Sequence, residues 1–278
     1  ESLGDPRFNS DAPFEGPATG GTIGITGAAG GAFGERRDGR RNLRAGGGGK
    51  RTENAVDLAL AWLAKHQAPD GSWSPDGFAR QCAVNTCDGR GDPELTPAAT
   101  ALSLLAFLGT GETHQVGIHK ETVKRGLKYL KSIQDADGCF GPRTGPYARF
   151  NHLTSALALS EAYGMTMSRT LKDSAQRGVQ FADGLRANLG PWDGTAGSGA
   201  SVPEMAWMVA VFRSAKLAEL DVDPSWLKRV CERLDALTDP VTGLVHAPTA
   251  AGTTAAIERF PEDRGTALTG AAALTRIF

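Results

Sequence analysis

The feature that most constrains this chain is a twelve-residue phrase that occurs four times. Residues 62–73 read WLAKHQAPDGSW, and residues 129–140 read YLKSIQDADGCF. Weaker copies stand at residues 181–192, FADGLRANLGPW, and at residues 234–245, LDALTDPVTGLV. In each copy an aromatic residue or Leu is followed by a Gln-like position, a Gly and a second aromatic residue or Val. A regular repeat of this length predicts stacked copies of one supersecondary unit.

The sequence around each copy is helical in pattern. Val56, Ala59, Leu60 and Leu63, for example, share one face of a helix. Half-apolar helices alternate with helices that are apolar on nearly every side. This alternation predicts an all-α fold of about four helical hairpins, with an outer layer around a buried inner layer. We expect outer helices near 54–67, 119–134, 172–187 and 225–238, inner helices near 97–109, 152–163, 203–219 and 264–278, and no strand.

Residues 1–52 differ from the remainder because they are rich in glycine and arginine and lack apolar periodicity. Such a composition cannot bury enough surface to offset chain entropy. We therefore divide the chain into an irregular arm, 1–52, and a repeat domain, 53–278. The arm is interpreted as a solvated tether or as a basic arm for RNA or an anionic membrane. Its basic residues include Arg36, Arg37, Arg40 and Arg41.

Composition and the chain start bear on the possible binding partners and on the cellular location. The net charge of −1 argues against nucleic-acid binding by the whole chain. No apolar run approaches the roughly 20 residues of a membrane span, and no signal peptide is recognisable. The chain begins with Glu1 rather than Met, so we expect that a tag, a targeting segment or an anchor was removed upstream. A periplasmic, secreted or membrane-anchored location is favoured over a cytoplasmic one.

Two of the four cysteines lie in an insertion after the first repeat. The copies are spaced by 67, 52 and 53 residues, and the excess in the first interval contains Cys82 and Cys87. In an oxidising compartment these two residues could form a disulfide. They could equally remain thiols, or bind a metal if two further ligands joined them, although no zinc-like spacing identifies such ligands. Cys139 and Cys231 are interpreted as small buried apolar residues.

The repeated phrase has a structural logic of its own. Its Gln can hydrogen-bond backbone groups exposed at a helix end, its Asp-Gly pair suits a tight turn, and its last aromatic ring can cover that turn. We therefore assign the residues of the phrase a structural role. They are Trp62, Gln67, Gly71, Trp73, Tyr129, Gln134, Gly138, Phe140, Phe181, Gly190, Trp192 and Gly243.

These repeats resemble the QW motifs of squalene–hopene and oxidosqualene cyclases, over roughly residues 53–278. The second copy matches from Arg125-Gly126 to Phe140 and the third from Arg177-Gly178 to Trp192, whereas the first has Leu58-Ala59 in place of the basic-Gly pair. The resemblance implies an α/α toroid, a fold shared with protein prenyltransferase β subunits and complement thioester domains. The chain is also similar to uncharacterised bacterial prenyltransferase or squalene-oxidase repeat proteins.

The catalytic motifs that the resemblance would imply do not stand in this sequence. A class II terpene cyclase needs D-x-D-D, and the nearest text is Asp221-Val222-Asp223-Pro224. Aromatic residues make up only 7% of the chain, so few rings could stabilise carbocations. The Asp, Cys and His that hold zinc in prenyltransferases have no match. We expect a non-catalytic scaffold or binding subunit without a cofactor; the alternative is a divergent enzyme acting on isoprenoids.

A few polar residues remain as binding candidates. Glu112, His114 and His119 fall within eight residues and could bind a metal. His152 and Glu204 begin inner helices, where they could face the mouth of a toroid. Glu161 lies within an apolar helix and needs a partner, for which we suggest Arg213. Expected partners are other proteins or a second copy, through the arm and the open edges of the ring. A lipid-like ligand or a membrane surface is a further candidate.

Overall fold

The computed structural model describes residues 49–83, 87–187, 202–245, 269–273 and 275, and these are mainly helical. Within them no strand forms, and only isolated bridges join Gln134 to Phe140 and Thr238 to Val245. The prediction of an all-α fold is confirmed. The helices are α4 (Lys50–Lys65), α5 (Thr96–Gly109), α6 (Lys120–Ser132), α7 (Ala148–Thr166), α8 (Arg169–Ala187), α9 (Val202–Leu217) and α10 (Trp226–Ala236), with 3-10 turns η2 (Phe78–Gln81) and η3 (Pro93–Leu95).

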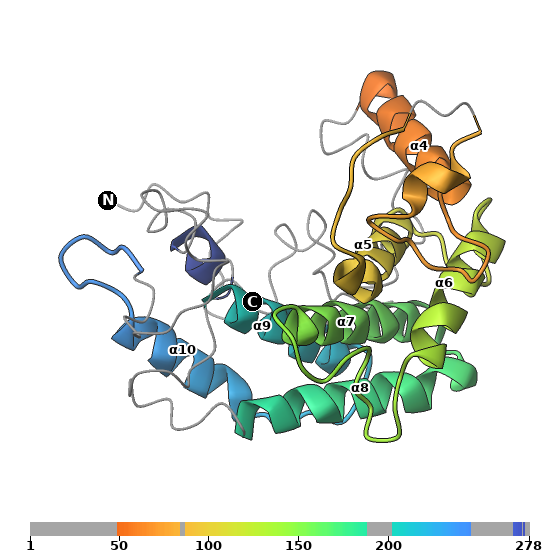
Figure 1. Cartoon of the computed structure of the whole chain (residues 1–278). Helices are drawn as coiled ribbons and strands as arrows, with labels where there is room; N and C mark the ends of the chain where they lie inside the picture. The colour runs from red at the N-terminus through yellow and green to blue at the C-terminus, as the bar shows by residue number, and fades with distance from the viewer. Residues whose placement is uncertain (1–48, 84–86, 188–201, 246–268, 274, 276–278) are drawn as a thin grey trace.

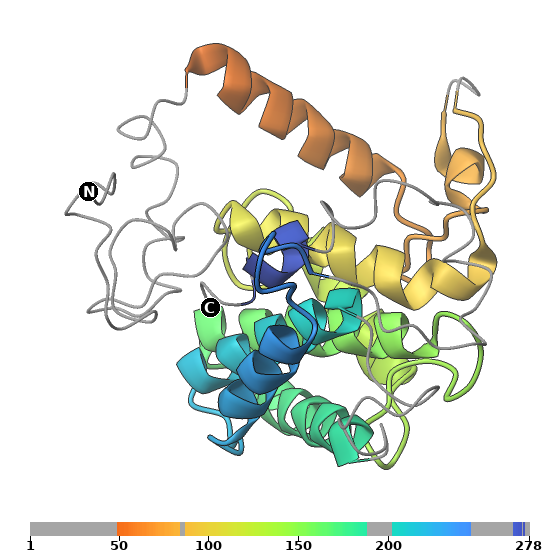
Figure 2. The ribbon, with the colours of Figure 1, turned by 90° about the vertical axis from the view of Figure 1, so that its left-hand side faces the viewer.

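The helices form the two layers that the alternation predicts. The inner helices α5, α7 and α9 pack against one another in succession, and α6, α8 and α10 cover them from outside (Figures 1 and 2). Helix α7 contacts α5, α8 and α9 and is buried along most of its length. Its sequence permits this because small residues such as Ala156, Ala158 and Ala162 let neighbouring helices approach on every side.

The outer helices bury one face each. In α6 the buried positions Val123, Leu127 and Leu130 recur at helical spacing, while lysines occupy the exposed side. Residues 269–273 are helical and lie within the fourth inner helix predicted at 264–278. The described residues thus carry the alternating pattern from α4 to α10.

The domain boundary differs slightly from the sequence prediction. Helix α4 begins at Lys50, after Gly49, so Lys50 and Arg51 belong to its first turn rather than to the arm. The arginines Arg36, Arg37, Arg40 and Arg41 lie outside the described residues. Among the described residues, no helix is both long enough and apolar enough to cross a bilayer.

Candidate functional site

The glutamine of the first repeat joins its own turn to the next hairpin. Gln67 Nε2 donates hydrogen bonds to the carbonyl oxygens of Gly71, at 2.9 Å, and Thr122, at 3.0 Å. Its Oε1 accepts hydrogen bonds from Arg125 Nε at 3.0 Å and Nη2 at 2.6 Å. Because Thr122 and Arg125 belong to α6, the buried amide ties the end of α4 to the following outer helix.

The second repeat makes the same set of contacts. Gln134 Nε2 donates to the carbonyl oxygens of Gly138, at 3.1 Å, and Ser174, at 2.9 Å. Its Oε1 accepts hydrogen bonds from Ser174 Oγ at 2.6 Å and Arg177 Nη2 at 3.3 Å. The glutamines do bond backbone carbonyl groups, as expected, but these belong to the turn itself and to the next outer helix rather than to the free end of the preceding helix. The structure adds that each bond set crosses from one repeat to the next.

The glycines of the motif provide room for these contacts. Gly71 has φ +94°, and a Cβ there would lie 2.4 Å from the carbonyl oxygen of Arg125. In the basic-Gly pair, a Cβ on Gly126 would lie 2.9 Å from the Trp73 ring. A Cβ on Gly178 would lie 2.6 Å from the Phe140 ring. The arginine of each pair therefore bonds the preceding glutamine, and its glycine receives the preceding aromatic ring.

The last aromatic residue of each turn is also anchored through its backbone. Trp73 N–H donates to Thr100 Oγ1 at 3.0 Å, and Phe140 N–H donates to His152 Nδ1 at 3.3 Å. In the fourth copy, Val245 N–H donates to Thr269 Oγ1 at 2.9 Å. Each acceptor comes from an inner helix, so a polar side chain near the start of that helix closes the turn.

His152 is a core residue, only 1% exposed. Its Nε2–H donates to the carbonyl oxygen of Gly178 at 3.1 Å, so both ring nitrogens are bonded when the ring is neutral. Phe140 and Phe181 lie against the ring, with centroid separations of 5.7 Å and 4.7 Å. Burial lowers the pKa of His152 to about 4. This geometry favours the structural role over a ligand-binding role.

The weaker copies differ in different ways. In the first copy, the N–H of Ala68 donates to the carbonyl oxygen of Ser72, four residues on. In the fourth copy, the N–H of Asp239 donates to the carbonyl oxygen of Leu244, five residues on, so the fourth turn is one residue longer. Gly243 keeps the left-handed turn, with φ +70°. In the third copy, Gly190 and Trp192 lie outside the described residues.

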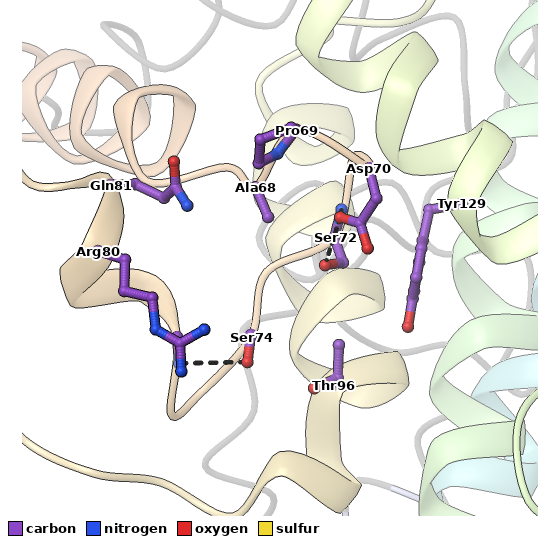
Figure 3. Close-up of a pocket in the computed structure, with 10 residues that line it drawn as sticks. Ala68, Pro69, Asp70, Ser72, Ser74, Arg80, Gln81, Thr96 and Tyr129 are labelled. Atoms are coloured by element: carbon purple, nitrogen blue, oxygen red, sulfur yellow. Dashed lines mark hydrogen bonds between the residues drawn. The ribbon is translucent and has the colours of Figure 1, made fainter.

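A pocket of about 460 Å³ opens beside the first turn (Figure 3). Its lining contains one acidic side chain, one cationic side chain and one aromatic ring, which belong to Asp70, Arg80 and Tyr129. Asp70 Oδ1 accepts hydrogen bonds from Ser72 N–H at 2.9 Å and Ser72 Oγ at 2.8 Å. Burial, together with the negative charge of Asp70, raises the pKa of Tyr129. The remaining lining residues are Ala68, Pro69, Ser72, Ser74, Gly77, Gln81 and Thr96.

The same end of α4 carries a cluster of two thiols and an imidazole. The ligand atoms of His66, Cys82 and Cys87 all lie within 4.8 Å of one another, and His66 Nε2 is 3.2 Å from Cys87 Sγ. Cys82 and Cys87 are both thiols in this structure, so their disulfide stays a prediction. A hydrogen bond to Cys82, burial and the charges of Cys82 and Asp88 raise the pKa of Cys87.

His66 was missed by the sequence analysis. Two local features of the sequence could have identified it. His66 stands directly before Gln67, where the second copy has Ile133, and the insertion with both cysteines follows the same turn. The other two cysteines lie apart from this cluster. Cys139 is buried, which raises the pKa of its thiol to about 11, as expected for a buried apolar residue. Cys231 is half-buried rather than fully buried.

The metal site suggested at Glu112, His114 and His119 is not assembled in the part of the chain that is described. The Glu112 carboxylate accepts hydrogen bonds from the backbone N–H of His119, at 2.8 Å, and from its Nδ1, at 2.9 Å. Burial lowers the pKa of His114, whose ring takes no part in this pair. The Glu112 carboxylate therefore closes its own loop instead of offering a ligand.

The remaining candidates pair within the inner layer. Glu161 and Arg213 are both 6% exposed, and the negative charge of Glu161 opposes the fall in the pKa of Arg213, which burial lowers to about 10. This agrees with the suggested pairing. Glu204 Oε1 lies 3.4 Å from Arg149 Nη1, so an ion pair links the first turns of α9 and α7.

Comparison with known proteins agrees with this geometry. Residues 42–147 match the family model of the squalene-hopene cyclase C-terminal domain. That range contains the first two turns and the cysteine-bearing insertion. No curated protein and no solved structure is significantly similar to the chain. The match covers less than half of the chain, and together with the two-layered helical array it supports a fold of the squalene–hopene cyclase- and prenyltransferase-like α/α-toroid type.

Proposed function

We propose that this chain is a non-catalytic α/α-toroid repeat protein that acts as a binding or scaffold subunit, and that it associates through α4. The observation that carries the proposal is the engagement of the motif residues. Gln67, Gln134 and their arginine partners bond one repeat to the next. Residues that resemble those of a cyclase therefore hold the array together.

The pocket composition supports the same interpretation. Cyclisation of an isoprenoid requires a strong acid and aromatic rings to stabilise carbocations. In the pocket beside the first turn, Tyr129 is the only aromatic residue, and Asp70 accepts two hydrogen bonds from Ser72 of its own turn. This lining offers a single aromatic ring where cyclisation would need several, and the hydrogen bonds of Asp70 serve the turn that carries it.

The exposed side of α4 supports its role as the associating surface. Leu58 is 72% exposed, and it occupies the motif position that carries Arg125 in α6 and Arg177 in α8. Val56, 36% exposed, lies in the same helix. Because an apolar residue replaces the arginine that bonds a neighbouring turn, we assign α4 an apolar contact, with a second copy of the chain as its occupant.

Sedimentation velocity of the whole chain over a range of concentrations tests this proposal. We expect dimers that Leu58→Lys weakens at least about tenfold, since a desolvated lysine charge would enter the contact. Val241→Lys is the matched control, because Val241 is 92% exposed in the fourth turn and away from α4. A chain that stays monomeric, or dimers indifferent to Leu58→Lys, would contradict the proposal.

The family match favours one alternative, a divergent enzyme acting on isoprenoids. Incubating the purified chain with squalene and with prenyl diphosphates distinguishes the two functions. We expect neither substrate to be converted. Formation of a cyclised or transferred product would replace the scaffold assignment by the enzymatic one.

A further inference from the structure

The cluster at the end of α4 brings together donors from two separate parts of the chain. His66 directly follows α4, and Cys82 follows η2 in the inserted loop. Their ligand atoms and the sulfur of Cys87 lie within 4.8 Å of one another. His66 is 5% exposed and Cys82 is 8% exposed, whereas Cys87 is half-buried. The cluster is therefore mostly shielded, with one side open toward solvent.

The imidazole is oriented before any ion arrives. His66 Nδ1 lies 2.7 Å from the carbonyl oxygen of Trp62, which can only accept a hydrogen bond. Nδ1 therefore carries the proton, and the lone pair of Nε2 points toward Cys87 Sγ at 3.2 Å. The Trp62 ring stacks on the imidazole at 4.0 Å between centroids. In metal-binding histidines the ring nitrogen that does not bind the metal is usually held by such a hydrogen bond.

The inserted loop is closed at its base, which fixes how it presents its cysteines. Gly91 N–H donates to the carbonyl oxygen of Pro75 at 3.0 Å. A Cβ on residue 91 would lie 2.4 Å from Pro75 Cβ, so this approach requires glycine. Cys82 N–H also donates to the Ala79 carbonyl oxygen at 3.1 Å. The first bond joins the two ends of the loop, and the second holds the backbone of Cys82 against the end of η2.

The donor set selects the kind of ion. Two thiols and one imidazole suit Zn²⁺, whereas Mg²⁺ and Ca²⁺ require oxygen ligands. Tetrahedral zinc, with Zn–S of about 2.3 Å and Zn–N of about 2.0 Å, holds its donors roughly 3.5–3.8 Å apart. His66 Nε2 and Cys87 Sγ, at 3.2 Å, are slightly closer than that range, and no other pair is more than 4.8 Å apart, so shifts of about 1 Å or less would give zinc geometry. A disulfide would use the sulfurs but would not explain the orientation of the imidazole.

We propose that His66, Cys82 and Cys87 bind one Zn²⁺ ion and leave its fourth position open to water or an exchangeable ligand. The ion attaches the inserted loop, which also helps to line the pocket beside the first turn, to the end of α4. This inference does not depend on the proposed scaffold function, because it concerns a separate set of side chains.

The test uses the whole chain, purified with a reductant, stripped by a chelator and then titrated with Zn²⁺. We expect one tightly bound ion per chain by elemental analysis and a higher melting temperature with zinc than without it. Substitution by Co²⁺ should give the absorption of a thiolate-to-cobalt charge transfer and of a tetrahedral site. Zinc binding should also lower the number of thiols that react with a disulfide reagent by two.

Variants separate this site from other thiols. Cys87→Ser and His66→Gln should each weaken Zn²⁺ binding at least about 100-fold, the upper end of the effect of losing an outer-shell partner. Cys231→Ser, which removes a half-buried thiol outside the cluster, should leave the affinity unchanged. Circular dichroism of the metal-free variants checks that α4 and its neighbours still fold.

Several results would overturn the proposal. The first is that the stripped chain takes up no zinc. The second is that the cobalt spectrum lacks a thiolate band. The third is that Cys87→Ser binds zinc as tightly as the unmodified chain. A Cys82–Cys87 disulfide that persists under the reductant would also refute it, and mass spectrometry after thiol alkylation detects that bond.

Discussion

The turns at residues 67–73 and 134–140 make the same contacts with the next outer helix but differ in what surrounds them. Gln67 and Gln134 donate and accept in matching patterns, and both turns contain a left-handed glycine. Before the glutamine, however, the first turn has His66 and the second has Ile133. Only the first is followed by the loop with Cys82 and Cys87. The shared contacts are those of the repeat, and the candidate chemistry lies in the difference.

A second difference lies in the group that accepts the hydrogen bond from the last aromatic residue. The first turn uses the hydroxyl of Thr100, which does not titrate near neutral pH, and the second uses the imidazole of His152. The same backbone requirement is therefore met once by a pH-independent group and once by a titratable one. Three predictions test how far the two turns are equivalent.

The largest effect is expected from Gly138→Ala. Gly138 has φ +98°, and the added Cβ would lie 2.3 Å from the carbonyl oxygen of Arg177, so backbone strain combines with a backbone clash. We expect a loss of roughly 3–5 kcal/mol in the free energy of unfolding. Urea denaturation followed by circular dichroism measures it.

Gly184→Ala is the matched control, because a Cβ at this position in α8 meets nothing within 4 Å. It should stabilise the chain by about 0.5–1 kcal/mol, as expected when alanine replaces glycine inside a helix. If both variants changed stability equally, the close approach of the second turn to α8 would be wrong.

The next effect is a loss of stability in acid that depends on His152. The pKa of this residue is lowered to about 4 in the folded chain, whereas in the unfolded chain its pKa is near the ordinary value of 6.5. The unfolded chain therefore binds the extra proton first. The stabilisation is complete above pH 6.5 and is lost as the pH falls toward 4, by roughly 3 kcal/mol in all.

Denaturation curves for the unmodified chain and for His152→Gln, recorded between pH 7.5 and 4, isolate this contribution. The variant should be less stable at neutral pH, with a flatter dependence on pH in this window. Parallel curves for the two chains would show that the acceptors of the two turns behave alike.

The smallest effect compares Gln67→Ala with Gln134→Ala. Each variant removes an amide that donates twice and accepts twice, and we expect a loss of about 2 kcal/mol. Gln67 should cost more, because it is buried whereas Gln134 is half-buried. Thermal unfolding of the pair would rank them, and a larger loss for Gln134→Ala would reverse our view of which turn is more tightly held.

Much of the fold could be predicted from the sequence because the repeat concerns local structure. Glutamine, Asp-Gly and aromatic positions recur at fixed spacing, and each acts within a few residues of a helix end. The predicted helices near 119–134 and 172–187 correspond closely to α6 and α8. What spacing alone did not indicate is that Arg125 and Arg177 bond the glutamine of the preceding repeat, since that contact spans more than 40 residues.

The candidate site could not be predicted for a related physical reason. Cys82 lies 16 residues beyond His66, and their proximity depends on the path of the inserted loop, which no local pattern specifies. The reverse holds at Glu112 and His119, which are close in sequence and were considered as metal ligands. There the carboxylate of Glu112 accepts hydrogen bonds from the backbone N–H and the ring of His119, so its lone pairs are used within the loop.

The replacement of arginine and glycine by Leu58 and Ala59 has a consequence for how such an array can lengthen. Each turn is received by the pair that follows it, so the bonding has a direction along the chain. Apart from Arg51 in its first turn, helix α4 carries no arginine, and Leu58 and Ala59 stand where α6 and α8 have the arginine that bonds a glutamine and the glycine that receives an aromatic ring. A turn that packed against Leu58 and Ala59 would therefore need contacts different from those made by Arg125-Gly126 and Arg177-Gly178.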